Sequence, residues 1–339
     1  MLRFLWLMWL IGGISACHPA EKEREGTSRA DSVRSAITAL DKEIGRKGTN
    51  PDLFARRAML LIEESQMEKA ISDLNKAISL DNRNAEYYII LSDVYLLMGQ
   101  PQKCSESLDK ALSIRSDSGK ALLKKAKLNL ILRDYRKTFE TIRLLLELDQ
   151  YNPPAYYLRA IALLETGDTS AAINELMKAA GQDQQYYDAY MQLAELYALR
   201  KDPLTESYLK NALNIRPGSR EALYMLGMYY QETEQFEKAI STYGNLAATD
   251  TTLATAPFNT GYIYLVFLKD FPTAVGFFTK ALQRDSSYFE AWYNRGLAYE
   301  LMNDYQKAES DYRMALKKQI NYDKAVEGLN RLDAVRSGN

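Results

Sequence analysis

A repeat with a period of about 34 residues runs through most of the chain and constrains its fold more than any other feature. Residues 85–114 and 289–318 both read as a helix, a short turn and a second helix, with small residues at matching places. The same register yields eight repeats, at 51–84, 85–118, 119–152, 153–186, 187–219, 220–253, 254–288 and 289–322. A fixed period of this length is typical of stacked helix pairs that bury their apolar faces against their neighbours.

Columns of equivalent residues set the register of these repeats. The eighth position is always small: Ala58, Ser92, Ala126, Ala160, Ala194, Gly227, Gly261 and Gly296. The second helix carries a large side chain, namely Leu74, Leu108, Ile142, Leu176, Leu209, Tyr243, Phe278 and Tyr312. We expect the small residues to let the two helices of a pair approach closely. The repeats of 33 and 35 residues are predicted to differ from the others in the turns, where insertions and deletions are tolerated best.

This pattern resembles the tetratricopeptide repeat family over about 80% of the chain. The resemblance implies an all-α fold, a right-handed α-solenoid of eight helix–turn–helix units. The third repeat departs from the family pattern at Asn129 and Leu145, and the seventh has Pro257 where a large residue is usual. A pentatricopeptide-like, RNA-binding array is the alternative architecture. The dominant step of 34 residues and the net charge of −1 oppose it.

The segments that flank the repeats are predicted to cap them. Residues 32–50 place Ala36 and Leu40 like the second helix of a half-repeat, which would cover the N-terminal end. Residues 323–339 form an amphipathic capping helix and a tail, with Ala325, Leu329 and Leu332 at helical spacing. Terminal units of a repeat array need such a polar outer face.

The N-terminus reads as a targeting segment rather than as part of the fold. Residues 1–16 carry Arg3 and a short apolar run, which predicts a signal peptide. Ile14 to Cys17 resembles the lipobox of bacterial lipoproteins, which implies cleavage before Cys17 and attachment of a lipid such as palmitate to it. An ordinary secretory signal with an incidental Cys17 is the alternative. Residues 17–31 carry mixed charge and few apolar side chains, and are predicted to be a disordered tether. In this resemblance, His18 after the cysteine favours the outer membrane over the inner one.

No motif for catalysis, metal binding or cofactor binding is found. His18 is the only histidine, and Cys104 stands in a column of small residues, where it reads as a buried replacement for alanine. There is no glycine-rich phosphate loop and no helical pair of histidines. The sequence therefore predicts a protein that is not an enzyme, with no cofactor, no metal and no nucleic-acid partner.

Family resemblance assigns the second, fifth, ninth and twelfth positions of each first helix to an inner face that lines a groove. In the C-terminal half these positions are rich in aromatic residues and methionine. The candidate partner-binding residues are Tyr157, Met191, Tyr224, Met228, Phe258, Tyr262 and Tyr293. The alternative is that these side chains simply pack between adjacent helices. Lys120, Lys124 and Lys127 form a possible patch for an acidic partner, or an ordinary solvated stripe.

These features together predict a non-enzymatic scaffold or adaptor lipoprotein of the bacterial cell envelope. It would bind a peptide or a helix of one or more partner proteins in its groove. It would be exported and would contact the membrane only through its N-terminal lipid. The alternative function is a surface lipoprotein that binds a glycan or a small solute on the aromatic inner face.

Overall fold

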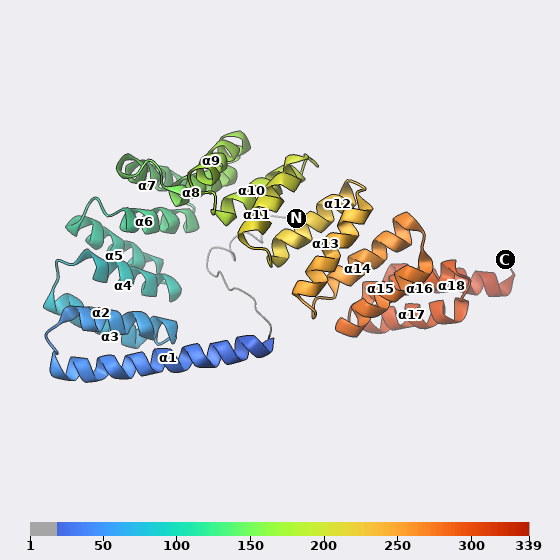
Figure 1. Ribbon diagram of the computed structural model, residues 1–339, viewed down its shortest axis with the longest axis horizontal. Coiled ribbons are helices and arrows are strands. Elements are labelled where there is room, and N and C mark those ends of the chain that lie inside the picture. The colour runs from blue at the N-terminus through green and yellow to red at the C-terminus, as the bar shows by residue number, and fades with distance from the viewer. Residues whose placement is uncertain (1–18, 339) are drawn as a thin grey trace. The chain divides into compact units, whose positions relative to one another are not determined.

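The computed structural model describes residues 19–338, with side chains from Arg29 onward. All regular secondary structure in this range is helical (Figure 1). The chain divides into two compact units, and unit 1 ends at Gln184 where unit 2 begins at Gln185. The fold is an α-solenoid of helix pairs, as the sequence predicts. Each helix packs mainly against its neighbours in sequence, and none of those described is long and apolar enough to cross a membrane.

Unit 1 consists of α1 and four helix pairs. Its helices are α1 (Pro19–Arg46), α2 (Pro51–Glu63), α3 (Met67–Leu80), α4 (Ala85–Leu97), α5 (Pro101–Ile114), α6 (Gly119–Ile131), α7 (Tyr135–Leu148), α8 (Pro153–Thr166) and α9 (Thr169–Gln182). The N-terminal helix packs against α2. First helices of neighbouring pairs also touch, as α2 does α4 and α6 does α8.

Unit 2 contains four further pairs and a terminal helix. Its helices are α10 (Tyr187–Ala198), α11 (Leu204–Ile215), α12 (Arg220–Glu232), α13 (Phe236–Thr249), α14 (Thr255–Tyr262), η1 (Ile263–Leu268), α15 (Phe271–Arg284), α16 (Phe289–Leu301), α17 (Tyr305–Lys318) and α18 (Asp323–Ser337). The last helix packs on both α16 and α17, and so covers the end of the array. Its bidentate ion pair, from Arg331 to Glu300 at 2.8 Å, fixes it to α16.

Local signals explain where many of these helices begin. Asn50, Asn84 and Asn152 accept a backbone N–H bond at the start of a first helix, and Asp134 and Asp168 do so at the start of a second helix. Such side chains satisfy backbone donors that have no partner within the helix. The caps recur with the repeat, so the turns and the helix starts carry the same period as the core.

The turn within each helix pair contains one residue in the left-handed backbone conformation. These residues are Ser65, Gly99, Arg133, Gly167, Lys201, Glu234, Lys269 and Asn303, at equivalent places in the eight repeats. Glycine occupies this place only in unit 1, at Gly99 and Gly167. Side chains with a Cβ are strained in this conformation. The geometry of the turn therefore requires the left-handed conformation at this position, whichever residue occupies it.

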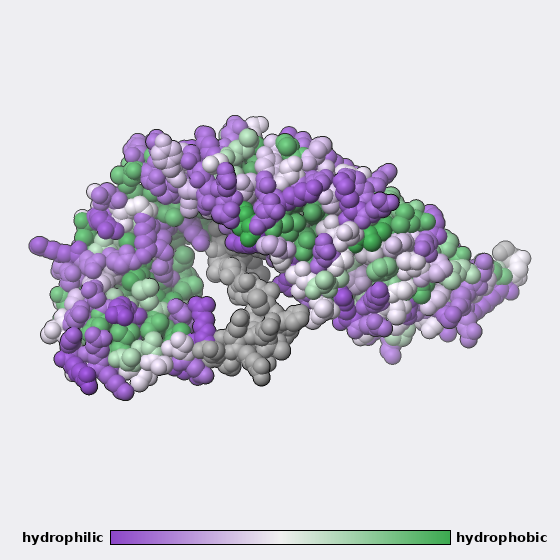
Figure 2. Space-filling view, viewed as in Figure 1, coloured by the Kyte–Doolittle hydropathy of each residue, from purple (hydrophilic) through white to green (hydrophobic). Residues whose placement is uncertain are grey.

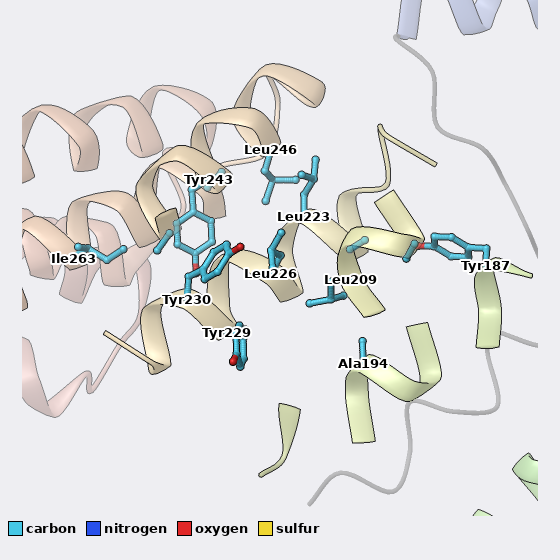
Figure 3. Packing of buried hydrophobic residues seen from close by; sticks show 14 residues of the cluster. Tyr187, Ala194, Leu209, Leu223, Leu226, Tyr229, Tyr230, Tyr243, Leu246 and Ile263 are labelled. Carbon is cyan, nitrogen blue, oxygen red and sulfur yellow. The ribbon is translucent and has the colours of Figure 1, made fainter. Parts of the chain in front are cut away.

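Packing inside each pair matches a small residue with a large one. Gly227 lies against the buried ring of Tyr243, and a Cβ placed on this glycine would come within 2.5 Å of that ring. Gly261 and Gly296 lie in the same way against Phe278 and Tyr312, with 3.0 Å to the nearest ring carbon. In unit 1 the eighth position carries a small side chain, and the buried partner is Leu or Ile. Figure 3 shows Tyr243 among Tyr230, Leu226 and Ile263 in the core of unit 2.

A buried ion pair recurs at the seventh position of three first helices. Arg57 donates two hydrogen bonds to Asp73 at 2.6 and 2.7 Å, and Arg295 donates two to Asp311 at 2.7 and 2.8 Å. Arg159 pairs with Glu175 in the fourth repeat. Each pair joins the two helices of one repeat. Bidentate geometry of this kind fixes the relative position of the two helices.

Two predictions from the sequence are wrong. The segment predicted to be a disordered tether, 17–31, is helical from Pro19, because α1 extends without a break to Arg46. Glu, Lys and Arg, which are frequent there, have high helix propensities. Residues 1–18, with the predicted signal peptide, Cys17 and His18, lie outside the described residues.

The second error concerns the extra residue of the seventh repeat. It lies in the first helix and not in a turn, because the chain widens into the π-helix η1 after α14. A π-helix takes up an added residue without breaking the helix. The turn that follows keeps its left-handed residue, Lys269.

Candidate partner-binding surface

The seven predicted contact residues differ in how far they are exposed. Tyr224 is the most open, with 41% of its surface accessible. Tyr157, Met191, Met228, Phe258, Tyr262 and Tyr293 are half-buried. We use "inner-face positions" for the second, fifth, ninth and twelfth residues of each first helix. Some residues at these positions, such as Ile89 and Leu265, are buried in the core. Not every inner-face position therefore lines a groove.

Five of the seven predicted residues pack against core clusters, Phe258 and Tyr262 against the cluster that contains Phe278 and the other three as follows. Tyr293 lies between Tyr312 and Tyr322, with ring centroids 5.6 and 5.5 Å away. Met191 packs against the main core cluster of unit 2. Tyr157 packs against the core cluster of unit 1 that contains Ile142. These three residues contribute as much to the packing between helices as to the surface.

A group of two rings in unit 2 joins α14 to the turn that precedes α16. Phe258 of α14 lies 4.6 Å from Tyr288, ring centroid to ring centroid. Burial, together with the charges of Glu290 and Tyr224, raises the pKa of Tyr288. Tyr288 is not among the residues predicted from the sequence, because it lies in the turn just before a repeat begins and not at an inner-face position.

The remaining predicted residues lie next to this ring group. The Asn259 amide approaches the sulfur of Met228 at 3.9 Å, which links α12 to α14. Tyr262 meets the exposed Phe267 edge-on, with centroids 6.2 Å apart. We call Tyr224, Met228, Phe258, Tyr262 and Tyr288 the aromatic surface of unit 2. On the side in view, Figure 2 shows apolar residues on the surface over α12 to α14.

The lysine patch of unit 1 is largely paired within the protein. Lys120 forms an ion pair with Glu86, and Lys124 pairs with Asp93 at 2.6 Å. Lys127 is half-buried and forms no ion pair with the described residues. Burial and the charge of Lys124 lower its pKa. Two of the three lysines are therefore already neutralised, so an acidic partner would have to compete with Glu86 and Asp93.

Cys104 is buried, as its place among the small residues predicts. Burial raises the pKa of its thiol to about 11. A thiol of this kind is mostly protonated at neutral pH and is a weak nucleophile. Within residues 19–338, no three His, Cys, Asp or Glu side chains are grouped so that they could hold a metal ion.

The comparisons with known proteins agree with this architecture. Models of the tetratricopeptide repeat match residues 51–84, 85–118, 153–186, 221–250 and 289–322. The chain belongs to the tetratricopeptide repeat family. No curated protein matches the sequence.

Solved structures with the same fold cover much of the chain. The protein pilF of Pseudomonas aeruginosa is 16% identical, with a TM-score of 0.52, over 61% of this chain and 94% of its own. The C-terminal part of a TPR repeat-containing protein from Cytophaga hutchinsonii is 16% identical, with a TM-score of 0.51, over 81% of this chain and 98% of its own. YrrB, described as a TPR protein with an unusual peptide-binding site, is 21% identical over 55% of this chain and 96% of its own, with a TM-score of 0.41. At these identities the likeness concerns the fold.

Proposed function

We propose that the chain is a non-enzymatic scaffold that holds a peptide segment or a helix of a partner protein on the aromatic surface of unit 2. The observation that carries the proposal is the exposed ring of Tyr224 in α12, together with the half-buried rings of Phe258 and Tyr288, which contact each other. Apolar groups that stay accessible in a contiguous group commonly mark a contact site. Aromatic side chains also contribute most to binding at such sites.

The same proposal places the protein in the bacterial cell envelope, anchored by a lipid on Cys17. Its support is the sequence from Ile14 to Cys17 after a short apolar run. His18 favours sorting to the outer membrane. Replacement of Cys17 by Ser should abolish labelling with radioactive palmitate and release the chain from membranes. Unchanged labelling of the Cys17→Ser variant would contradict the anchor without affecting the binding surface.

The binding surface can be tested by recovering partners from crosslinked envelopes with variants of the full chain. Tyr224→Ala combined with Tyr262→Ala should reduce partner recovery at least ten-fold, which corresponds to about 1.4 kcal/mol. Lys120→Ala combined with Lys124→Ala is the control in unit 1 and should change recovery less. Tyr151→Ala removes a ring that is 63% exposed in unit 1 and should have no effect.

Two results would overturn this assignment. If the double tyrosine variant folds, by circular dichroism, and still recovers every partner, the contact surface lies elsewhere. If it unfolds, the single Tyr224→Ala variant decides, because that ring is exposed and its loss should leave the core intact. A preparation that binds oligosaccharides and recovers no protein would favour the glycan-binding alternative.

A further inference from the structure

The inner-face positions of unit 2 carry carboxylates but neither Lys nor Arg. The carboxylates at these positions are Asp188, Glu195, Glu221, Glu290 and Glu300. Unit 1 differs, because its third repeat provides Lys120 and Lys127 at the same positions. The two units therefore present different charges beside their first helices.

Most of these carboxylates in unit 2 have no cation of their own. Among the described residues, only Glu300 forms an ion pair, with Arg331. Glu195 accepts a hydrogen bond from the Gln192 amide at 3.2 Å, and burial raises the pKa of the Glu195 carboxyl. In unit 1, by contrast, Glu86 and Asp93 are paired with Lys120 and Lys124. A carboxylate that is partly removed from water without a cation is costly, and a partner's cation would relieve that cost.

The rings of the aromatic surface also lack the cations that cover other rings of this chain. Tyr95, Tyr230 and Tyr299 occupy one position of their repeats, and each lies under a lysine of its own repeat. The three distances from nitrogen to ring centroid are 5.4, 5.1 and 5.2 Å. In the part of the chain that the structure describes, no Lys or Arg lies over Tyr224, Phe258, Tyr262 or Tyr288. A cation of a partner can therefore lie over such a ring without displacing a cation of this chain.

One place combines both features. Glu290 lies two residues after Tyr288, in the first turn of α16, and its charge adds to burial in raising the pKa of Tyr288. Tyr288 in turn contacts Phe258, with 4.6 Å between the ring centroids. Two rings beside an unpaired carboxylate make a suitable environment for a Lys or Arg side chain, because the ring faces and the carboxylate attract the same charge.

We propose that the segment bound by unit 2 is basic as well as apolar, and that one of its Lys or Arg side chains lies on the Tyr288 ring next to Glu290. Apolar residues of the same segment contact Met228 and Tyr262. The proposal rests on the function proposed above and adds the chemistry of the partner. It also explains why the aromatic surface carries no cations of its own, since these would repel or displace the partner's.

A pair of synthetic peptides tests the charge preference directly. The full chain without its first 17 residues is titrated into fluorescein-labelled peptides of about a dozen alternating residues, Lys with Leu in one and Glu with Leu in the other, with anisotropy as the readout. We expect the Lys peptide to bind at least ten-fold more tightly, and its affinity to fall with added salt. Equal binding, tighter binding of the Glu peptide, or binding of neither would overturn the proposal.

Matched variants locate the effect. Glu290→Gln removes the charge and keeps the shape, and should weaken binding of the Lys peptide at least three-fold. Glu237→Gln makes the same change on the exposed surface of α13 and should leave it unchanged. Equal effects of the two variants would mean that only general charge attraction is at work, and would overturn the proposed position. If Tyr224→Ala reduces partner recovery while the two peptides bind equally, the scaffold function stands and the basic partner does not.

Discussion

The two units form the same helix pairs with different side chains. Unit 1 fills the space between paired helices with a small side chain on one helix and Leu or Ile on the other, such as Ala160 and Leu176. The last three repeats of unit 2 remove the small side chain entirely and insert an aromatic ring, as at Gly227 and Tyr243. The combined volume is nearly conserved, as dense packing requires. Neither residue of such a pair can therefore change size alone.

The surfaces of the two units differ in a parallel way. In unit 1, Glu86 and Asp93 are paired with lysines of the following repeat, while Asp52 accepts a hydrogen bond from the Tyr87 hydroxyl. Among the described residues of unit 2, no inner-face carboxylate except Glu300 forms an ion pair. The two units thus share a backbone fold. Most charged inner-face side chains of unit 1 are paired within the protein, whereas the carboxylates and rings of unit 2 are available to a partner.

The largest predicted effect compares the buried ion pairs of the two units. Asp311→Ala should cost about 3 kcal/mol, because it leaves the buried Arg295 guanidinium with one hydrogen-bond partner, the Thr279 hydroxyl, and the ring of Trp292 beneath it. Asp73→Ala should cost less, because Arg57 keeps a hydrogen bond to Asp41. Urea unfolding of the two variants measures the difference. An equal loss of unfolding free energy in the two variants would mean that Asp41 contributes nothing to the stability of the chain.

Adding one methyl group should distinguish the two kinds of core. Gly227→Ala should destabilise the chain by about 1–3 kcal/mol, since its Cβ would meet the Tyr243 ring. In a Tyr243→Leu background the same change should become stabilising, by about 0.5–1 kcal/mol, because alanine favours a helix more than glycine does. Thermal unfolding of the four proteins gives both values. A destabilising effect in both backgrounds would show that the ring is not the obstacle.

Alkaline pH should weaken unit 2 before unit 1. Burial raises the pKa of Tyr230, Tyr243, Tyr288 and Tyr312 in unit 2 and, to about 12, of Tyr87 in unit 1. Unfolded tyrosines ionise near pH 10, so the stability that depends on neutral rings is present below that pH and is lost above it. Hydrogen exchange measured by mass spectrometry at rising pH, corrected for intrinsic rates, should show α12–α17 losing protection first. Earlier loss in α2–α9 would contradict this order.

The smallest effect concerns the turns within the helix pairs. Lys201→Gly and Glu234→Gly in unit 2 should each stabilise the chain by about 0.5–1 kcal/mol, because glycine adopts a positive φ without strain. Gly99→Ala and Gly167→Ala in unit 1 should destabilise it, although both sites have open space around them. Thermal unfolding would refute this account if all four changes proved neutral.

Much of the fold could be predicted from the sequence because the packing partners recur at fixed spacing. The column of small residues to which Ala58 and Gly227 belong identifies where the two helices of a pair touch, whichever side chain lies opposite. The π-helix at Ile263–Leu268 has no such signal, since one added residue reads equally well as a longer turn. The start of α1 at Pro19 also has no clear signal, because a segment with mixed charge and few apolar residues can be disordered or helical.

The candidate site was predicted only in part. Helical spacing identifies Tyr224 and Phe258, because both stand at inner-face positions. It cannot show that Tyr293 is enclosed by Tyr312 and Tyr322, which come from two other helices or their ends. Nor can it identify Tyr288, which approaches the surface from a turn. Contacts between repeats depend on the detailed packing of side chains and not on the period.

The central claim is that a partner binds unit 2 through the aromatic surface and does not bind the equivalent face of unit 1. The most direct measurement is photocrosslinking in living cells, with benzoylphenylalanine in place of Tyr224 or of Met59. Met59 is the matched control, because it is an apolar inner-face residue of unit 1 and is 53% exposed. We expect a discrete adduct from position 224, mapping to one basic and apolar segment of a partner, and none from position 59. Equal adducts from both positions, or an adduct from position 59 alone, would contradict it.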